Sequence, residues 1–307
     1  MENQSVFSDS FFAMRTRCDV VFTTAETELA GHAFQLVRNE IEELENRISR
    51  YIPDSPLSEI NSTEKNIWIS VPDDLWDILT ICFDFYQMSS GAFDITATAL
   101  IDLWKNGNTP TENEIEAAKK SSGFDKVEFD FENQKLKFQE DGVEFDLDGI
   151  GKGIALDTIK PILIKEGIKN GIVSFGESSI FALGIHPNGE KWPLGIRNSF
   201  DTNEFIHLFS ASNEIITTSG TILNTDEGEV VEKNSTISPV TGFPVEGKRT
   251  VSVKSESATM GEFISIIWLI LPENDKSILA EKLKNIEILE VDYNEKNEYK
   301  TKLSLLT

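Results

Sequence analysis

Hydrophobic and polar residues recur along this chain with two different periods, which predicts a protein that contains both helices and strands. Residues 11–22 form the first apolar segment and are predicted to be a strand. The sequence Thr23-x-x-Glu26 then offers a capping box, a common start of a helix. A long amphipathic helix is expected behind it, with apolar residues at helical spacing: Ala33, Val37, Ile41, Leu44 and Ile48.

Further helices are predicted from start signals and apolar spacing. Pro72 suits the first turn of a helix that ends near Gly91, and Thr111-x-x-Glu114 is predicted to cap a short helix. A helix after Gly153 is expected to be kinked by Pro161. The apolar run 261–271 fits a helix or a strand, and Thr259-x-x-Glu262 favours a helix. Residues 275–283 are predicted to be helical.

Alternation with period two predicts the strands. Residues 127–131 and 136–138 flank Asn133-Gln134 and are expected to form a hairpin. Residues 143–147 are predicted to be a strand that leads into a glycine-rich turn. Shorter strands are expected at 172–175, 180–183, 205–209, 215–218 and 250–253, and two more close the chain. The sequence predicts an α/β (α+β) protein with largely antiparallel sheets flanked by helices. Because no linker is evident, we expect a single domain over residues 1–307.

Composition narrows the classes of partner. The 307 residues include 28 Lys and Arg and 52 Asp and Glu, which gives a formal net charge of −24. Phosphate backbones and anionic lipids repel such a surface, so nucleic acid is excluded as a partner. No apolar run is long enough to span a membrane, and the N-terminus lacks a signal peptide or lipoprotein motif. We expect a soluble protein, either cytoplasmic or exported with its signal removed.

The segment Asp146-Leu-Asp-Gly-Ile-Gly-Lys-Gly153 is the most informative for chemistry. A strand end, a glycine-rich turn and a helix start expose backbone N–H groups that suit a phosphate, and Lys152 adds a positive charge. An ordinary strand-to-helix turn explains the same pattern. Glu262 lies in an apolar run, where a carboxylate is costly unless it is paired or bound to a metal. A helix-start glutamate in a capping box is the alternative.

Other segments leave similar alternatives open. Asp94 and Thr96 are either a turn cap or a ligand-binding pair. The hydroxyl-rich residues 217–221 either cradle an anion or simply end a strand. The proline-bracketed turn 238–244 has structural and functional interpretations. No catalytic triad or metal motif uses the three histidines.

Taken together, these segments resemble the ApbE family, the FAD:protein FMN transferases, over about residues 11–271. Phe12-Ala-Met-Arg-Thr16 is similar to the family's Met-Gly-Thr, and residues 51–61 to its Tyr-x-x-x-Ser-x-[IL]-Ser-x-[IL]-Asn. Ser90-Gly-Ala-Phe-Asp-Ile-Thr96 resembles Gly-x-Phe-Asp-x-Thr. Asp146 to Gly153 resembles Asp-Leu-Gly-Gly-Ile-Ala-Lys-Gly. Further matches are Trp192-Pro-Leu-Gly-Ile-Arg197, Thr218-Ser-Gly220 and Ile237-Ser-Pro-Val-Thr-Gly-Phe-Pro244.

The resemblance implies an ApbE-like fold that binds FAD and, with Mg²⁺, transfers FMN to a Ser or Thr of a partner protein and releases AMP. Some members hydrolyse FAD instead. The flavin-site residues that it implies are Met14, Tyr51, Ala92, Phe93, Asp94, Asp146, Lys152, Ser219, Gly220 and Ile237. It places the Gly149 carbonyl and Glu262 at the metal, with Asp148 as a possible added ligand, and Thr218 and Thr241 near the transfer site.

The sequence departs from the family pattern on the metal and pyrophosphate side. Glu262 replaces an Asp, and Ile266 stands at the position of a Thr ligand. Ser235-Thr-Ile-Ser-Pro239 replaces His-x-Ile-Asp-Pro. Glu177 replaces a glycine and Thr221 an Asp. Asp148 stands where the family has Gly or Ser, beside the metal-ligating carbonyl, where it could help hold a metal in altered geometry.

Three functional hypotheses follow. The first is a metal-dependent flavin transferase with an unidentified acceptor protein. The second is a flavin- or nucleotide-binding homologue that has lost catalysis and acts as a carrier or regulator. The third is a purely structural partner protein with a closed cleft. The flavin-side motifs argue against the third, and Ile266 argues against the first.

Overall fold

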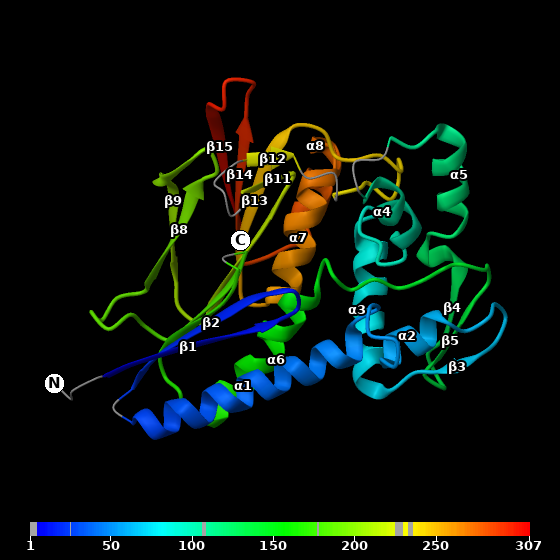
Figure 1. Cartoon of the computed structure of the whole chain (residues 1–307). Helices are drawn as coiled ribbons and strands as arrows, with labels where there is room; N and C mark the ends of the chain where they lie inside the picture. Colours follow the sequence, from blue (N-terminus) through cyan, green and yellow to red (C-terminus); the bar gives the residue numbers. More distant parts are fainter. Residues whose placement is uncertain (1–4, 25, 106–108, 177, 225–229, 233–235) are drawn as a thin grey trace.

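An eight-stranded sheet forms the centre of the computed structural model, which describes residues 5–24, 26–105, 109–176, 178–224, 230–232 and 236–307. Its order is β1-β2-β6-β7-β10-β13-β14-β15, and all neighbours are antiparallel (Figure 1). The strands are β1 (Ser5–Ala13), β2 (Thr16–Thr24), β6 (Gly171–Phe175), β7 (Ser179–Leu183), β10 (Glu214–Gly220), β13 (Lys248–Ser255), β14 (Ile286–Tyr293) and β15 (Tyr299–Leu306). The predicted antiparallel sheet is confirmed.

The first predicted strand is wrong in one respect, because residues 11–22 cross a hairpin turn. Met14 and Arg15 form the two-residue loop between β1 and β2, and both have positive φ, 51° and 60°. Loops with two positive φ angles usually contain Asn-Gly or another glycine. Since neither residue is present here, the sequence carries no turn signal.

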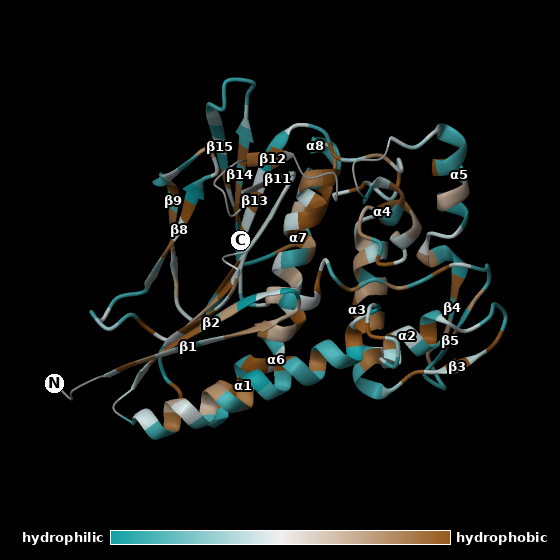
Figure 2. Ribbon diagram, viewed as in Figure 1, coloured by the Kyte–Doolittle hydropathy of each residue, from teal (hydrophilic) through white to brown (hydrophobic). Residues whose placement is uncertain are grey.

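Three helices cover one face of the sheet: α1 (Thr27–Ile48), α6 (Gly151–Lys165) and α7 (Ala258–Ile270). Helix α7 packs on β10 and β13, and α6 lies against α1 and α7. Figure 2 shows that α7 is apolar along most of its length, which fits its position between the sheet and other helices. The predicted buried face of α1 is confirmed by all five of its spaced apolar residues.

Two capping-box interpretations are wrong, although the helix that Thr259-x-x-Glu262 favoured is present as α7. Glu26 is the N-cap of α1 and makes no side-chain cap bond, because Thr23 belongs to β2 and its hydroxyl donates to the Asn170 carbonyl. Helix α7 begins one turn before Glu262, with Ser257 as its N-cap. The Thr111 capping box is confirmed at the start of α5 (Glu112–Lys120).

A second group of elements packs beside this core. It consists of α2 (Pro56–Asn61), α3 (Asp73–Met88), α4 (Thr98–Trp104), α5, the short helix η2 (Phe124–Lys126), and the sheet of β3 (Ile69–Ser70), β5 (Lys135–Phe138) and β4 (Val127–Asp130). The predicted hairpin at Asn133-Gln134 is confirmed.

The predicted strand 143–147 is wrong, because this buried segment joins no sheet. The Asn61 side chain instead bonds both the N–H and the carbonyl of Phe145, at 2.8 and 2.9 Å, and the Asp146 N–H donates to the Ile95 carbonyl. Side chains and a neighbouring loop therefore satisfy the backbone groups that a sheet ladder would otherwise pair.

The remaining elements complete the molecule. The hairpin of β8 (Trp192–Asn198) and β9 (Asp201–Ala211) forms a smaller apolar cluster with β10 and β14 through Phe209, Ile216, Leu289, Val291 and Tyr293. The structure also contains β11 (Ile222–Asn224), β12 (Val230–Glu232) and α8 (Glu273–Ala280). No helix within the described residues combines the length and the apolar character that crossing a bilayer requires.

Candidate functional site

Tyr51 follows α1 in a turn where three cations surround its ring. The cationic groups of Arg50, Arg15 and Lys105 lie 4.7, 5.3 and 5.8 Å from the ring centroid. Tyr51 is 45% exposed, so part of the residue faces solvent. Cations at these distances are attracted to the ring face. This arrangement places an accessible aromatic surface among three cations, each of which also pairs with a nearby carboxylate.

Arg50 links this turn to the glycine-rich segment. Its Nε lies 2.8 Å from Asp146 Oδ2, and its Nη2 donates to Asp102 Oδ1, also at 2.8 Å. The Asp146 side chain is 7% exposed. Burial, together with the charge of Asp148, raises the pKa of Asp146 even though Arg50 opposes the shift. Arg50 thus holds two candidate residues, Tyr51 and Asp146, on one side of the molecule.

The turn after Asp146 leads into α6 beside α7. The Asp148 N–H donates to Asp146 Oδ1 at 2.9 Å. A Cβ added at Gly149 would lie 3.5 Å from Ile266 Cδ1, so an apolar side chain borders this glycine. A Cβ on Gly153 would lie 2.8 Å from the Ala258 carbonyl oxygen, a clash that shows why α6 and α7 need glycine here.

Glu262 projects from α7 into a buried polar contact with two other elements. Its Oε2 accepts the Gly153 N–H at 2.9 Å, and its Oε1 accepts the Ser179 hydroxyl at 2.7 Å. Burial raises the pKa of this carboxyl group, while the charge of Lys152 and the two hydrogen bonds oppose the shift. One carboxylate oxygen is therefore hydrogen-bonded to α6 and the other to β7. These two hydrogen bonds explain how a carboxylate is tolerated in an apolar helix.

Asp94 and the aromatic residues before α4 form another part of the site. Phe93 meets Phe85 and Phe263 edge to face, with centroids 5.9 and 5.5 Å apart. Asp94 Oδ1 accepts both the backbone N–H and the hydroxyl of Thr96, at 2.8 and 2.6 Å. The turn-cap interpretation of Asp94 therefore describes its observed contacts. Ala92 is buried at the same corner.

We expect Asp94 to make the protein less stable as pH rises. Burial raises the pKa of Asp94 to about 6, so the folded chain binds this proton more tightly than the unfolded chain. The stabilisation is fully present below about pH 4 and is lost as pH rises through 6, a difference of about 3 kcal/mol. Asp94→Asn keeps the acceptor for Thr96 and should abolish this contribution. Urea unfolding of both proteins at pH 4.5 and 7.5 tests this, and equal pH slopes would contradict it.

Strand β10 carries the hydroxyl-rich residues, which alternate between its two faces. The Ser219 hydroxyl bonds Ser265 of α7 at 2.7 Å, and Thr217 Oγ1 faces Gly261 of the same helix. Thr218 lies between them in the strand, and its hydroxyl bonds Ser252 of β13 at 2.9 Å. Ser219 is therefore on the α7 face with Glu262, and Thr218 is on the other.

The turn that contains Ile237 and Thr241 packs against α4. Ile237 forms an isolated bridge with Pro244, and Trp104 Nε1 donates to the Gly242 carbonyl at 2.9 Å. The Thr236 hydroxyl donates to the Gly220 carbonyl at 3.4 Å, which ties this turn to the end of β10. Thr241 contacts Ser238 and Phe243 within its own turn.

Direct contacts bring many of the predicted site residues together, through the turn 146–153 and helix α7. The residues joined in this way are Tyr51, Asp146, Asp148, Gly149, Phe93, Glu262 and Ser219. Met14 packs against the core at the hairpin tip, and Lys152 influences Glu262 by its charge. The hydroxyl of Thr218 bonds Ser252 and that of Thr241 accepts the Phe243 N–H, so neither hydroxyl is hydrogen-bonded to this group. Glu177 and Ser235, two of the departures from the family pattern, lie outside the described residues.

The contacts of the three predicted metal-site residues do not fit a divalent cation. Both oxygens of Glu262 accept internal hydrogen bonds, Ile266 borders Gly149, and Asp148 Oδ2 lies 3.5 Å from Arg15 Nη1. Magnesium requires several oxygen ligands in near-octahedral geometry. Within the part of the chain that the structure describes, three or more His, Cys, Asp or Glu side chains nowhere converge on one point.

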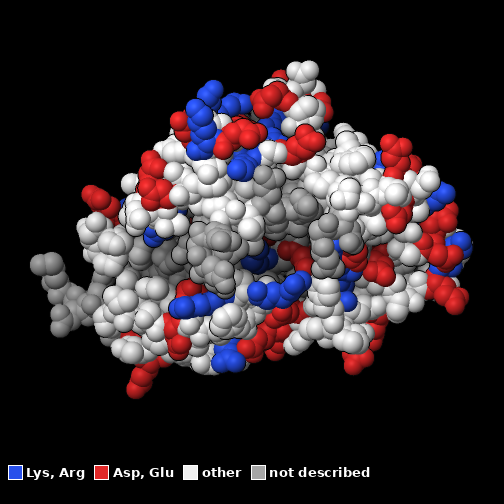
Figure 3. Space-filling model, turned by 45° about the horizontal axis from the view of Figure 1, so that its top comes forward, with Lys and Arg blue, Asp and Glu red and all other residues white. Residues whose placement is uncertain are grey.

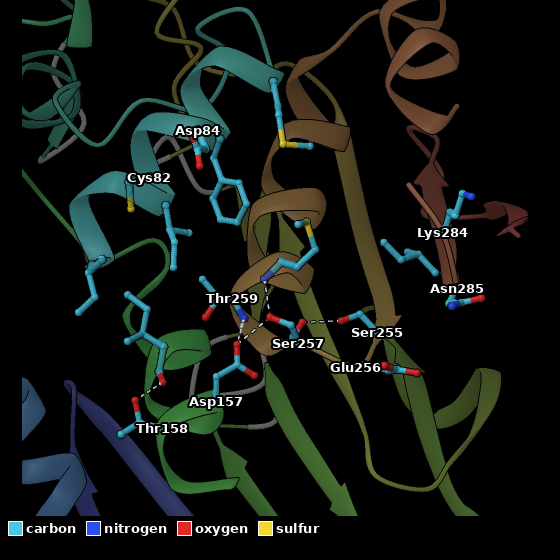
Figure 4. A pocket seen from close by; sticks show the side chains of 17 residues that line it. Cys82, Asp84, Asp157, Thr158, Ser255, Glu256, Ser257, Thr259, Lys284 and Asn285 are labelled. Atoms are coloured by element: carbon cyan, nitrogen blue, oxygen red, sulfur yellow. Dashed lines mark hydrogen bonds between the residues drawn. The ribbon is translucent and has the colours of Figure 1, made fainter. Parts of the chain in front are cut away.

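A cavity of about 740 Å³ lies apart from these residues, between α3, α6, α7 and the start of β14 (Figure 4). Its apolar side includes Phe85, Met88 and Met260. At its polar end Asp157 accepts hydrogen bonds from Ser257 and from the first N–H groups of α7. None of the motif residues predicted to bind FAD or a metal lines this cavity, although Phe85 in its wall meets Phe93 edge to face. Figure 3 shows acidic side chains around much of the face in view and several basic ones toward its middle.

Sequence patterns alone do not single out three residues that contact the site: Arg50, Arg15 and Ser179. Arg50 and Arg15 each adjoin a motif residue, Tyr51 and Met14, in a chain with a large excess of acidic residues. Their position beside motif residues is the feature of the sequence that indicates a role for them in the site. Ser179 had no signal, because only the packing of β7 against α7 brings it to Glu262.

Comparison with known proteins gives consistent results. The sequence model of the ApbE family matches residues 14–289. The FAD:protein FMN transferase of Buchnera aphidicola subsp. Schizaphis graminum is 27% identical over 259 residues, or 81% of this chain and 76% of the relative. That of Chlamydia trachomatis is 29% identical over 246 residues, 76% and 75% of the two chains. The flavin transferase ApbE from Vibrio cholerae matches with a TM-score of 0.84 at 21% identity, covering 98% of this chain and 97% of that one, which confirms the predicted fold.

Proposed function

The chain belongs to the ApbE family, and on that premise we propose that it is an FAD:protein FMN transferase. Its substrate is FAD, and its second substrate is a Ser or Thr hydroxyl of an acceptor protein. The relatives that cover most of this chain carry the same name. The observation that carries the proposal is the contact of Tyr51, Arg50 and the segment from Asp146 to Gly149 at one place in the fold.

The proposed reaction exchanges one phosphate bond for another. The acceptor hydroxyl oxygen bonds to the phosphorus of the FMN half, the pyrophosphate P–O bond breaks, and AMP leaves with the bridging oxygen. The hydroxyl proton passes to solvent or a nearby base. Reactions of this kind depend on positioning and on stabilising the developing charge. When water replaces the hydroxyl, the products are FMN and AMP.

We propose that the residues carried over from the motifs bind FAD. Tyr51 offers an accessible ring against which the flavin can stack, and Phe93 and Ala92 shape the corner beside Asp94. Asp146 and Lys152 lie along the glycine-rich turn, where backbone N–H groups favour an anion. Ser219, Gly220, Met14 and Ile237 complete this proposed set, and Thr218 and Thr241 remain candidates near the transfer site. No step is assigned to magnesium, because the present donors do not fit it.

Release of AMP from FAD is the direct test. We expect wild-type protein to release AMP from FAD, with one FMN bonded to an acceptor or freed for each AMP. Tyr51→Ala should lower kcat/KM at least tenfold through loss of ring contact with the flavin. Trp68→Ala is a matched control, since Trp68 is also exposed, with Lys137 over its ring, but lies beside β3. Chromatography of nucleotides and in-gel flavin fluorescence measure both products. Equal loss in the two variants would contradict the role of Tyr51.

A second candidate function is flavin binding without transfer. The specific observation in its favour is Ile266, an apolar side chain that borders Gly149 where the family motif has a ligand. In that case FAD raises the melting temperature by mass action, but no AMP forms. The same samples distinguish the two functions, because binding and AMP release are measured together.

A further inference from the structure

The tip of the β1–β2 hairpin holds a side chain in an unfavourable backbone conformation. Arg15 has φ of 60°, the left-handed region that favours glycine, and Met14 before it has φ of 51°. Each such residue costs free energy unless surrounding contacts impose the conformation. The partly buried side chain of Met14 packs against the core and anchors the turn. Arg15 itself is exposed, and its side chain contacts Tyr51 and Asp148 at the surface of the molecule.

The side chain of Arg15 is directed at the candidate site. Its guanidinium lies 5.3 Å from the Tyr51 ring centroid, and Nη1 lies 3.5 Å from Asp148 Oδ2. Both partners of this ion pair are exposed, 72% for Arg15 and 48% for Asp148. A surface pair of this kind contributes little stability, so the guanidinium can exchange its partner readily.

The other two cations beside Tyr51 form closer ion pairs with carboxylates. Arg50 is 10% exposed and contacts both Asp146 and Asp102. Lys105 is also paired with Asp102. Arg15 is therefore the cation beside Tyr51 whose only carboxylate contact among the described residues is long and exposed. An arginine stays charged at every working pH and binds phosphate through two N–H groups.

We propose that Arg15 binds a phosphate group of the flavin nucleotide and that this chain binds FAD without a divalent cation. The proposal rests on FAD being the substrate, as proposed above. It combines two observations: the Glu262 carboxylate is already engaged with Gly153 and Ser179, and Arg15 is a weakly held cation beside Tyr51. On binding, the guanidinium exchanges the Asp148 carboxylate for a phosphate oxygen. Arg15 then supplies part of the positive charge that a metal would otherwise bring.

Titration calorimetry tests the proposal. FAD and riboflavin are each titrated into the protein in EDTA and in about 5 mM Mg²⁺, a concentration high enough to fill a weak magnesium site. We expect the wild-type Kd for FAD to agree within about twofold in the two buffers. Arg15→Gln should raise that Kd about tenfold, the loss of one charge-assisted hydrogen bond, and leave riboflavin, which has no phosphate, unchanged. Arg17→Gln is the matched control, since Arg17 lies on the same hairpin and pairs with Asp19.

Arg15→Gly separates binding from stability. Because glycine accepts positive φ without strain, this variant should melt at a higher temperature than wild type while binding FAD as weakly as Arg15→Gln. A residue with a purely structural role would not produce this opposite pair of effects.

Two results would overturn the inference while leaving the proposed function intact. One is FAD affinity that rises tenfold or more with Mg²⁺, and the other is equal FAD affinity of wild type and Arg15→Gln. If wild type binds no FAD in either buffer, both the inference and the proposed function fail.

Discussion

Glu262→Ala is expected to lower the free energy of unfolding by about 3 kcal/mol. The substitution leaves the Gly153 N–H and the Ser179 hydroxyl buried without a partner, and each such group costs roughly 1–3 kcal/mol. It also opens a void between α6, α7 and β7. Removal of a buried carboxylate offsets part of this loss, since the Glu262 side chain is deeply buried.

Glu262→Gln is the control that separates structure from metal binding. The glutamine carbonyl can accept the Gly153 N–H, and its amide can donate to the Ser179 hydroxyl oxygen. We therefore expect stability within about 1 kcal/mol of wild type. Urea unfolding gives both values, and AMP release from FAD is measured on the same proteins. If Glu262→Gln folds normally but loses all AMP release, the negative charge of Glu262 has a role beyond the contacts seen here.

Arg50→Leu is expected to have the second large effect, a loss of about 3 kcal/mol at pH 7. Arg50 is the ion-pair partner of Asp146, whose side chain is 7% exposed, and removing one partner of a buried pair typically costs 3–5 kcal/mol. The ion pair of Arg50 with Asp102 contributes less to stability, because Asp102 is 44% exposed. The variant should also bind FAD poorly, because Tyr51 and Asp146 lose the group that holds them together.

A double-mutant cycle with Asp146→Asn identifies the cause. The double variant should recover about half of the stability lost in Arg50→Leu, because no unpaired buried charge remains. Chemical unfolding of wild type, the two single variants and the double variant gives the coupling energy. Additive effects would mean that Arg50 stabilises the fold through packing and Asp102 instead.

The spacing of apolar residues and the residues typical of turns and caps are sufficient to predict much of this fold. The buried stripe of α1, the capping box at Thr111 and the hairpin at Asn133-Gln134 depend on residues close in sequence, and the structure confirms them. The hairpin turn at Met14 and Arg15 was missed because neither residue is a usual turn former, and its conformation is imposed by pairing of β1 with β2. The segment 143–147 has strand-like alternation, but contacts with Asn61 and Ile95 replace the ladder.

Some features of the candidate site likewise follow from the sequence, and others follow only from the tertiary structure. The sequence by itself determined the family resemblance, the order of the motifs and the absence of a usual ligand at Ile266, since each depends only on residue identity. Tertiary structure alone decided that Glu262 bonds Gly153 and Ser179, that Thr218 turns to the face opposite α7, and that Arg15 reaches Asp148 above Tyr51. The physical reason is distance along the chain. Ser179 and Glu262 are separated by 83 positions, and Arg15 and Asp148 by 133. Only the packing of helices on the sheet brings residues so far apart in the chain together.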